Sequence, residues 1–221
     1  FCDEEKISIV RNGIDINEFK FHESDVTKKF KINGEFILFL GRFHEVKGID
    51  TLLEAINLIK KNPSLEKIKI MIMGVDFGYE NEMESIIKKF NLFENVVVVK
   101  KPTRKDVISA YNECKFLVLP SKWELSPLTP LEGFACKKTV ISTTAHGIPF
   151  TISHNENCLL VPPSDPQNLA NAILELLQNP AKCQELAKSG FKMVSNEANL
   201  DDMSNKNFSV YEKAIKLNNG D

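Results

Sequence analysis

The sequence predicts an α/β fold built on a doubly wound parallel sheet with helices on both faces, followed by a helical C-terminal end. Three observations predict this fold class. Short apolar runs alternate with amphipathic segments along most of the chain. The runs are apolar nearly throughout rather than at every second position, as parallel strands covered on both faces require. After about Val161 the apolar residues recur only at helical spacing.

Six apolar runs are expected to be the strands of this sheet. They end in glycine, proline or polar residues, which are typical of turns. The six runs are residues 36–40, 68–73, 96–99, 116–119, 140–143 and 159–161.

Amphipathic segments between these runs are expected to be helices that cover the sheet. They are residues 48–61, 82–90, 106–114 and 128–135. The first segment shows the pattern most clearly, because its apolar residues recur every three or four positions. The residues on its apolar face are Ile49, Leu52, Leu53, Ile56 and Ile59.

The last third of the chain predicts three further helices. Asp165 is expected to cap the first of them, with Pro166 at its first position. A second helix is expected from Pro180 to about Val194. The third is expected over residues 201–217, where apolar side chains again share one face. These side chains are Phe208, Tyr211 and Ile215.

Length, composition and charge exclude several classes of protein. The chain has 221 residues, of which 43% are hydrophobic and 26% are charged, so one large domain can bury its own core. Lysine and arginine total 28 against 30 acidic residues. This balance gives no electrostatic reason to expect nucleic acid or an anionic membrane as the main partner. No apolar run approaches the roughly 20 residues of a membrane span, and the first residues show no signal-peptide pattern.

The cysteines indicate neither a metal site nor a disulfide framework. They are odd in number, widely scattered and never arranged as C-x-x-C. The five are Cys2, Cys114, Cys136, Cys158 and Cys183. We therefore expect reduced thiols, a cytoplasmic location, and a fold that depends on no metal ion or disulfide.

A first candidate binding loop, residues 41–48, lies between an expected strand and an expected helix. Doubly wound sheets bind ligands beyond the carboxyl ends of strands, where helix N-termini present unpaired N–H groups to anions. Gly41 permits close approach of the backbone, and Arg42 and Lys47 carry charges suited to a diphosphate. In the alternative, both cations belong to a solvated turn and pair with Glu45. The glycine spacing disfavours dinucleotides and ATP.

Two carboxylates, Glu124 and Glu132, stand where a second loop runs into an apolar helix. Carboxylates are seldom buried without a partner, so this arrangement indicates a polar ligand. Glu132 could accept hydrogen bonds from both vicinal hydroxyls of a ribose, and Glu124 would lie nearer a transferred group. In the alternative, Glu132 is an ordinary exposed helix acid and Glu124 is a cap. An anion-binding loop together with a hydroxyl-binding acid indicates a sugar nucleotide.

Five short motifs follow one another along the chain. They are Asn12-Gly13-Ile14-Asp15 with Phe19, Gly41-Arg42 with Lys47-Gly48, Glu124 with Glu132, His146-Gly147-Ile148-Pro149, and Leu159-Leu160-Val161-Pro162-Pro163. Their order and spacing resemble the C-terminal half of GT-B retaining glycosyltransferases of the glycogen-synthase-like and mannosyltransferase-like family, known as glycosyltransferase family 4 or group 1. The resemblance covers nearly the whole chain.

The resemblance implies a division of the chain into three parts. Residues 35–198 would be a Rossmann-like domain that binds a nucleotide sugar, one half of the GT-B fold. Residues 1–34 would derive from the segment between the two GT-B domains. Residues 199–221 would be a C-terminal helix and tail that cross back toward the other domain, with an apolar face left uncovered.

The resemblance also implies roles for the candidate site residues. Arg42 and Lys47 match the residues that contact the donor diphosphate, Glu132 the one that binds ribose, and Glu124 the one that contacts the donor sugar. The expected catalytic residues are Glu124, Arg42 and Lys47. The expected donor-binding residues are Gly41, Arg42, Lys47, Glu124, Ser126, Leu128, Thr129 and Glu132. Members of this kind need no metal ion or other cofactor, because protein cations stabilise the leaving group.

The chain departs from the family pattern in two places. Ser126-Pro127 stand where the family commonly has Phe-Gly, and Pro127 has no N–H to offer a phosphate. Residues 146–150 stand where the family often has Gly-Gly-x-x-Glu, so any role of that later acid is absent.

The function implied by the resemblance is transfer of a hexose from a nucleotide diphosphate sugar to an acceptor with retention of configuration. The sequence offers no convincing nucleophile for a double displacement, so attack from the face of departure is expected. The expected partners are the nucleotide-sugar donor and a separate N-terminal acceptor-binding domain that this chain lacks. Membrane contact is expected only through that domain, and nucleic acid is not expected. The base, the sugar and the acceptor are not specified.

Two alternatives stay open, of which the first belongs to a different class. The first is a non-catalytic module that holds a nucleotide or a sugar phosphate, which Pro127 and the lacking acceptor domain favour. The second is a related GT-B enzyme such as a nucleotide-sugar epimerase or a phosphorylase. A phosphorylase would need a lysine-bound cofactor, for which the sequence carries no signal.

Overall fold

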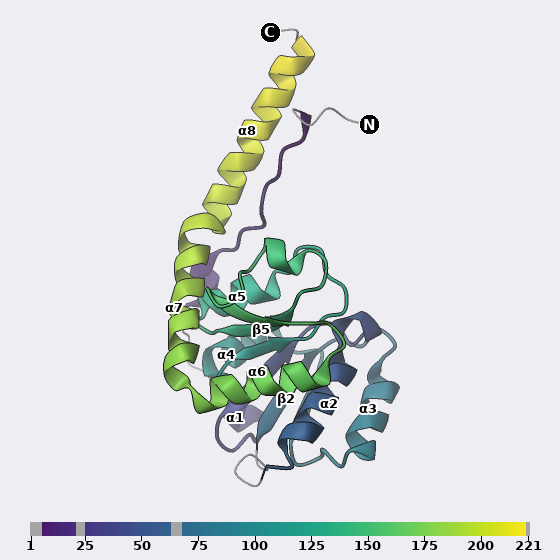
Figure 1. Ribbon diagram of the computed structural model, residues 1–221. Coiled ribbons are helices and arrows are strands. Elements are labelled where there is room, and N and C mark those ends of the chain that lie inside the picture. The colour runs from purple at the N-terminus through teal and green to yellow at the C-terminus, as the bar shows by residue number, and fades with distance from the viewer. Residues whose placement is uncertain (1–5, 21–24, 63–67, 220–221) are drawn as a thin grey trace.

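The computed structural model describes residues 6–20, 25–62 and 68–219. Their centre is a sheet with helices packed around it (Figure 1). The sheet has six strands in the order β3-β2-β1-β4-β5-β6, and every neighbouring pair is parallel. The strands are β1 (Phe36–Leu40), β2 (Lys69–Gly74), β3 (Val96–Lys100), β4 (Leu117–Leu119), β5 (Val140–Thr143) and β6 (Cys158–Val161). All six expected runs are strands, so the predicted fold class is confirmed.

Helices alternate with the strands along the chain, as the helical spacing of apolar residues predicts. They are α2 (Ile49–Ile59), α3 (Glu80–Lys89), α4 (Arg104–Glu113), α5 (Thr129–Ala135), α6 (Pro166–Gln178), α7 (Pro180–Glu197) and α8 (Leu200–Asn219). Among the described residues the structure adds short elements that the sequence did not predict, since they are too short to show a period. These are α1 (Val26–Lys29) and the 3-10 turns η2 (Ile16–Phe19), η3 (Glu45–Lys47) and η5 (Ile148–Phe150).

The two faces of the sheet bury separate cores. Helices α2, α3 and α6 pack on the face to which Ile37 and Phe39 of β1 point. Helices α1, α4 and α5 pack on the face to which Phe36 and Leu38 point. Successive side chains of a strand alternate between the faces, so a sheet covered on both sides needs apolar residues at every position. The apolar stripe predicted for residues 48–61 is buried in the first core.

The chain order of the strands reverses between β1 and β4, which are neighbours in the middle of the sheet. From β1 the chain winds outward to β2 and β3, and from β4 it winds in the opposite direction to β5 and β6. Such a switch point leaves a crevice beyond the carboxyl ends of the two central strands, where doubly wound sheets bind their ligands. The loops at residues 41–48 and 120–128 meet there.

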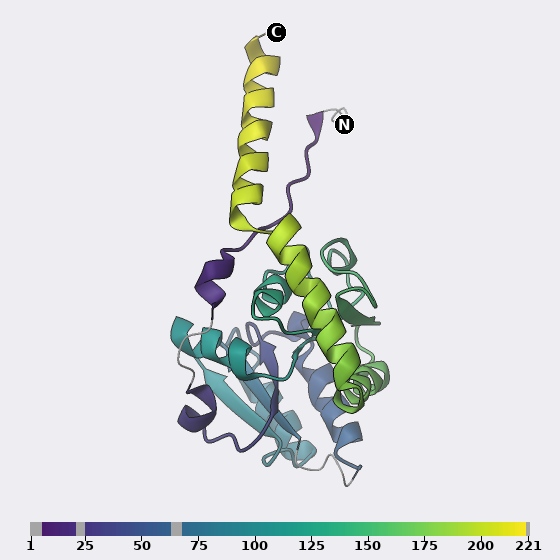
Figure 2. The ribbon, with the colours of Figure 1, turned by 90° about the vertical axis from the view of Figure 1, so that its left-hand side faces the viewer.

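Helix α8 extends away from the sheet and runs beside the N-terminal segment, residues 6–14, as Figures 1 and 2 show from two directions. The Asn-Gly motif joins the two. The N–H of Ile14 donates to the carbonyl oxygen of Ala198, and the N–H of Leu200 donates to that of Ile14, both at 3.0 Å. Only glycine fits at position 13, because a Cβ there would lie 2.3 Å from the carbonyl oxygen of Asn199.

The apolar face of α8 is exposed within the described residues, as the sequence predicted. Phe208, Tyr211 and Ile215 are 64%, 66% and 60% exposed. Residues 220–221, which belong to the expected C-terminal tail, lie outside the described residues.

Four of the cysteines are buried free thiols: Cys114, Cys136, Cys158 and Cys183. Burial raises the pKa of the Cys114 thiol to about 12. Cys2 lies outside the described residues. Among the described residues no group of three histidines, cysteines or acids is placed to hold a metal ion, and no helix has the length and hydropathy to span a bilayer.

The start of α4 carries a capping box that ties it to α1. Asp106 donates its N–H to Thr103 Oγ1 at 3.2 Å and accepts the N–H of Thr103 at 3.0 Å. Its other carboxylate oxygen lies 2.5 Å from the ammonium group of Lys29. Burial raises the pKa of Asp106, but the hydrogen bonds from Lys29 and Thr103 outweigh burial and hold this pKa below its usual value.

We expect Asp106→Ala to lower the free energy of unfolding by about 1 to 2 kcal/mol at pH 7, because the helix loses its cap and Lys29 loses its partner. A carboxyl group whose pKa is depressed on folding stabilises the protein above its unfolded pKa, here near 3.8, and loses this contribution as the pH falls through the folded pKa. The loss in the variant should therefore shrink in urea titrations below pH 3.8. Asp201→Ala, at an exposed carboxylate, is the control. If Asp106→Ala lowered the free energy of unfolding equally at pH 7 and below pH 3.8, the contacts of Asp106 with Lys29 and Thr103 would not be the source of its contribution.

Candidate functional site

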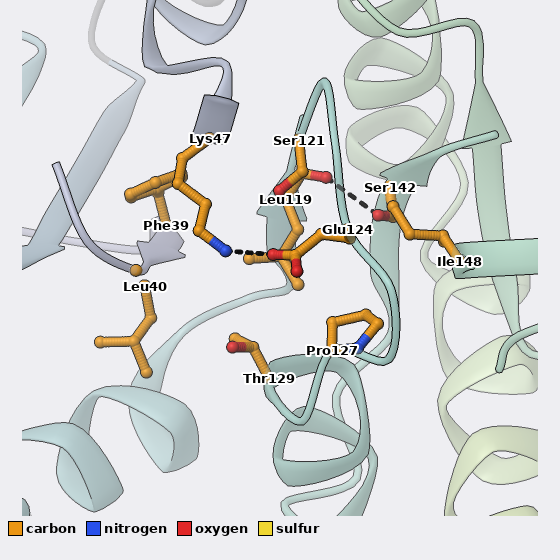
Figure 3. A pocket seen from close by; sticks show the side chains of 11 residues that line it. Phe39, Leu40, Lys47, Leu119, Ser121, Glu124, Pro127, Thr129, Ser142 and Ile148 are labelled. Carbon is orange, nitrogen blue, oxygen red and sulfur yellow. Dashed lines mark hydrogen bonds and ion pairs between the residues drawn. The ribbon is translucent and has the colours of Figure 1, made fainter. Parts of the chain in front are cut away.

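A pocket lies at the switch point of the sheet (Figure 3). Its apolar floor comes from the ends of the two central strands, with Phe39 and Leu40 from β1 and Leu119 from β4. Its polar groups come from the loops beyond these strands and from the start of α5. They include Lys47, Ser121, Glu124 and Thr129. The carboxyl edge of the sheet therefore combines an apolar floor with polar groups of both charges.

Lys47 and Glu124 form an ion pair in this pocket, drawn as a dashed line in Figure 3. Their side chains are only 16% and 19% exposed. The alternative in which Lys47 belongs to a solvated turn and pairs with Glu45 is therefore wrong for this residue. An ion pair removed from water is costly to break unless a new charged partner arrives. An anionic ligand would provide such a partner for Lys47.

Backbone contacts hold the two loops of the pocket together. Gly48 has a left-handed conformation, with φ 67°, and a Cβ at this position would lie 2.0 Å from the carbonyl oxygen of Pro120. The N–H of Lys122 donates to the carbonyl oxygen of Val46 at 2.8 Å. The ammonium group of Lys122 lies 2.6 Å from Asp50 at the start of α2. These contacts place Lys47 and Glu124 opposite each other.

Arg42 turns toward the neighbouring loop and does not line the pocket. The backbone after β1 stays paired with the loop after β2, since the N–H of Phe43 donates to the carbonyl oxygen of Val75 at 2.8 Å. The exposed guanidinium of Arg42 lies over the ring of Phe77, 5.1 Å from its centroid. Arg42 therefore lies at the same edge of the sheet as the pocket, with its charge on an aromatic face.

Glu132 lies one helical turn after Thr129 on α5 and is held by two donors. The hydroxyl of Tyr111 donates to its Oε2 at 2.6 Å, and Nη1 of Arg104 lies 3.4 Å from its Oε1. The side chain is 16% exposed. The alternative of an ordinary exposed helix acid is therefore wrong for Glu132. Nor is Glu124 the cap of α5, because Leu128 occupies the N-cap position.

Ser126, Leu128 and Glu132 do not line the pocket. Ser126 faces the N-terminal segment, where the side-chain amide of Asn12 donates to its Oγ at 2.9 Å and to its carbonyl oxygen at 3.2 Å. Leu128 is 45% exposed. Of the donor-binding residues expected from the sequence, the pocket brings together Gly41, Lys47, Glu124 and Thr129.

Four residues of this region are not among those expected from the sequence. Ser121 stands just after β4 and Ser142 lies in β5, where it donates to the carbonyl oxygen of Leu119 at 2.9 Å. Their position at the ends of predicted strands was a usable signal. Tyr111 and Arg104 gave none, because they meet Glu132 only when α4 and α5 pack on the same face of the sheet.

The fold and the pocket define a class of protein: a Rossmann-like α/β domain with its site at the switch point, the architecture of one half of a GT-B glycosyltransferase. The family model described as "Glycosyl transferases group 1" matches residues 21–193. The chain belongs to this family, as the resemblance of its motifs predicted.

A curated protein and a solved structure are similar to the chain. An uncharacterised glycosyltransferase of Methanocaldococcus jannaschii is 30% identical over 171 residues, which cover 77% of this chain and 44% of that protein. The structure of sucrose-phosphate synthase from Thermosynechococcus elongatus superposes with a TM-score of 0.84 at 26% identity, covering 95% of this chain and 53% of that one. The chain spans less than half the length of the curated relatives it matches.

A more distant structure shares the fold. HepE of Anabaena, solved in complex with UDP-glucose, superposes with a TM-score of 0.81 at 21% identity, covering 95% of this chain and 57% of that one.

Proposed function

We propose that this chain is the donor-binding part of a retaining glycosyltransferase that transfers a hexose from a nucleoside diphosphate sugar to an acceptor. The observation that carries the proposal is the meeting of Lys47, Glu124 and Thr129 at the switch point of the sheet in a member of the glycosyl transferase family. HepE binds UDP-glucose and has the same fold, which supports a nucleoside diphosphate sugar as the donor class.

In this proposal the diphosphate lies on the loop after β1. Gly41 leaves room for the phosphate oxygens, and the ammonium group of Lys47 reaches into the pocket. Helix α2 begins directly after this loop, so the positive end of its dipole lies at the same edge of the sheet. Arg42 would supply a second cation after leaving the ring of Phe77.

The two carboxylates hold the two sugars of the donor. Glu124 lies beside Lys47 in the pocket and orients the transferred hexose through its hydroxyl groups. Glu132 lies one turn along α5 and accepts hydrogen bonds from the ribose. The nucleotide would then extend from the switch point along α5 toward the start of α4.

The proposed chemistry is stabilisation of a leaving group. As the bond between the anomeric carbon and the phosphate oxygen breaks, negative charge grows on that oxygen, and Lys47 and Arg42 stabilise it more strongly than in the ground state. The acceptor hydroxyl forms the new bond to the anomeric carbon from the face of departure and gives its proton to the departing phosphate, so configuration is retained. These cations would make a metal ion unnecessary.

The acceptor would be bound by a separate N-terminal domain of the whole enzyme. The length of the curated relatives supports this proposal, because the chain covers 44% of the M. jannaschii protein. We place the enzyme in the cytoplasm, where nucleotide sugars and reduced thiols would be available.

A second candidate function is a non-catalytic module that binds a nucleotide or a sugar phosphate. The observation that favours it is Pro127, which lines the pocket and offers no N–H to a phosphate. Transfer of a labelled hexose by the full-length protein would decide for the enzyme, whereas tight donor binding without any product would decide for the module.

The donor class can be tested with a thermal-shift panel of UDP, GDP and ADP, each alone and as its hexose conjugate, in the presence of EDTA. One nucleoside diphosphate should raise the melting temperature, since a ligand at 100 times its Kd stabilises the folded state by about 2.7 kcal/mol. The matching nucleoside is the control and should shift it far less. Glu124→Gln should keep the shift with the diphosphate and lose the difference between diphosphate and conjugate. If no nucleoside diphosphate raised the melting temperature, the proposed donor site would be wrong.

A further inference from the structure

A buried phenol holds one oxygen of the Glu132 carboxylate. Tyr111 on α4 is 0% exposed, and its hydroxyl donates to Glu132 Oε2 at 2.6 Å. Its ring meets Phe19 edge to face, with 5.9 Å between the centroids. Burial, and then the charge of Glu132, raise the pKa of Tyr111 well above its usual value. The phenol therefore stays protonated and remains a donor at neutral pH.

The second oxygen of Glu132 faces a guanidinium that is itself held in place. Arg104 Nη1 lies 3.4 Å from Glu132 Oε1, while its Nε donates to Glu18 at 2.7 Å. The guanidinium carbon lies 4.9 Å from the ring centroid of Phe19. Arg104 thus has three contacts that fix its direction, and Phe19 supports both donors of Glu132.

These contacts occupy half of the hydrogen-bond acceptor positions of the Glu132 carboxylate. An ionised carboxylate offers about four acceptor positions on two oxygens. Tyr111 takes one position on Oε2 and Arg104 one on Oε1, which leaves one on each oxygen. Two vicinal hydroxyls require two acceptors side by side. The Glu132 side chain keeps 16% of its surface exposed, and it lies one turn after Thr129, which lines the pocket.

We propose that Tyr111 and Arg104 are positioning residues that hold Glu132 in the one orientation that can accept both ribose hydroxyls. The inference rests on the proposed function of Glu132 as the ribose ligand and extends it to two residues of α4. A carboxylate fixed before the ligand arrives loses less side-chain entropy on binding, so its hydrogen bonds contribute more to affinity.

The test compares ribonucleotides with 2′-deoxyribonucleotides. Calorimetry gives the Kd of UDP, GDP and ADP and of their 2′-deoxy counterparts for the wild type and for Tyr111→Phe, which keeps the ring and its packing. We expect Tyr111→Phe to weaken the bound ribonucleotide about tenfold and its deoxy counterpart less than about twofold. The preference for ribose should therefore fall, which a merely structural defect would not produce.

Three variants complete the experiment. Tyr79→Phe makes the same change in a half-buried tyrosine against the other core and should leave the preference unchanged. Arg104→Met removes the second donor, and because this side chain is 47% exposed the variant should still fold. We expect the preference for ribose to fall less than in Tyr111→Phe, because Arg104 lies farther from the Glu132 carboxylate than the Tyr111 hydroxyl does. Thermal unfolding without ligand checks that each variant is folded.

Glu132→Gln separates the inference from the function on which it rests. If Glu132→Gln loses the preference for ribose while Tyr111→Phe and Arg104→Met keep it, the positioning role is wrong and the ribose site stands. If Glu132→Gln also keeps the preference, the ribose does not bind there, and both statements fall together.

Discussion

Replacing Lys47 by methionine is expected to remove most of the affinity for nucleoside diphosphates. A charge-assisted hydrogen bond contributes about 1.5 to 3 kcal/mol, so the loss of this contact alone corresponds to roughly 10- to 100-fold in Kd. The variant also leaves the Glu124 carboxylate, which is 19% exposed, without its partner. This carboxylate would lie beside the phosphates of the ligand and repel them. Binding of the nucleoside without phosphates should change little. Calorimetric titration with both ligands measures the difference.

Arg42→Met is the matched control, because it removes the other expected cation from the same loop. The guanidinium of Arg42 lies on Phe77 rather than in the pocket, so the loss should be smaller than for Lys47. The double variant Lys47→Met with Glu124→Gln separates the lost attraction from the added repulsion, since coupled partners give non-additive effects. Equal losses for the nucleoside and its diphosphate would place Lys47 away from the phosphates.

Gly48→Ala is expected to give the largest loss of stability among single small substitutions in the site. At φ 67° an alanine is strained by about 1 to 2 kcal/mol. Its Cβ would also lie 2.0 Å from the carbonyl oxygen of Pro120, and relieving such an overlap costs about 1 to 3 kcal/mol more. The loops after β1 and β4 must then separate, so affinity for nucleoside diphosphates should fall as well. Urea unfolding and calorimetry measure the two effects.

Gly78→Ala provides the control for this prediction. Gly78 also has a positive φ, 90°, but a Cβ there would meet nothing within 4 Å. This variant therefore reports the cost of the backbone conformation alone. If the two substitutions lowered the free energy of unfolding equally, contact with the Pro120 carbonyl would not be what restricts position 48 to glycine.

The strands and long helices could be predicted because their signals are local. A parallel strand buried on both faces is apolar at every position, as in residues 36–40 and 140–143, and a helix on the sheet repeats its apolar residues, as from Ile49 to Ile59. Helix α1 escaped prediction because its four residues, 26–29, show no period. Its position depends on α4, through Lys29 and Asp106.

The candidate site was predictable only where it follows from the winding of the chain. Lys47 and Glu124 stand on loops that leave neighbouring parallel strands, and such loops share one edge of the sheet, so the sequence could assign both to one site. That the two form an ion pair, rather than Lys47 with Glu45, depends on how the loops pack against each other through Gly48 and Pro120.

By itself the sequence determined the fold class, the edge of the sheet that holds the site, and the resemblance to the glycosyl transferases, because each of these is recorded in local patterns of apolar residues and short motifs. The tertiary structure alone decided the direction of Arg42 toward Phe77 and the hold of Tyr111 and Arg104 on Glu132. The physical reason is that packing decides which partners surround a side chain, and those partners lie on other elements. Phe77 is 35 positions from Arg42 in the sequence, and Glu132 is 28 positions from Arg104. The spacing of residues within one segment therefore cannot predict these contacts.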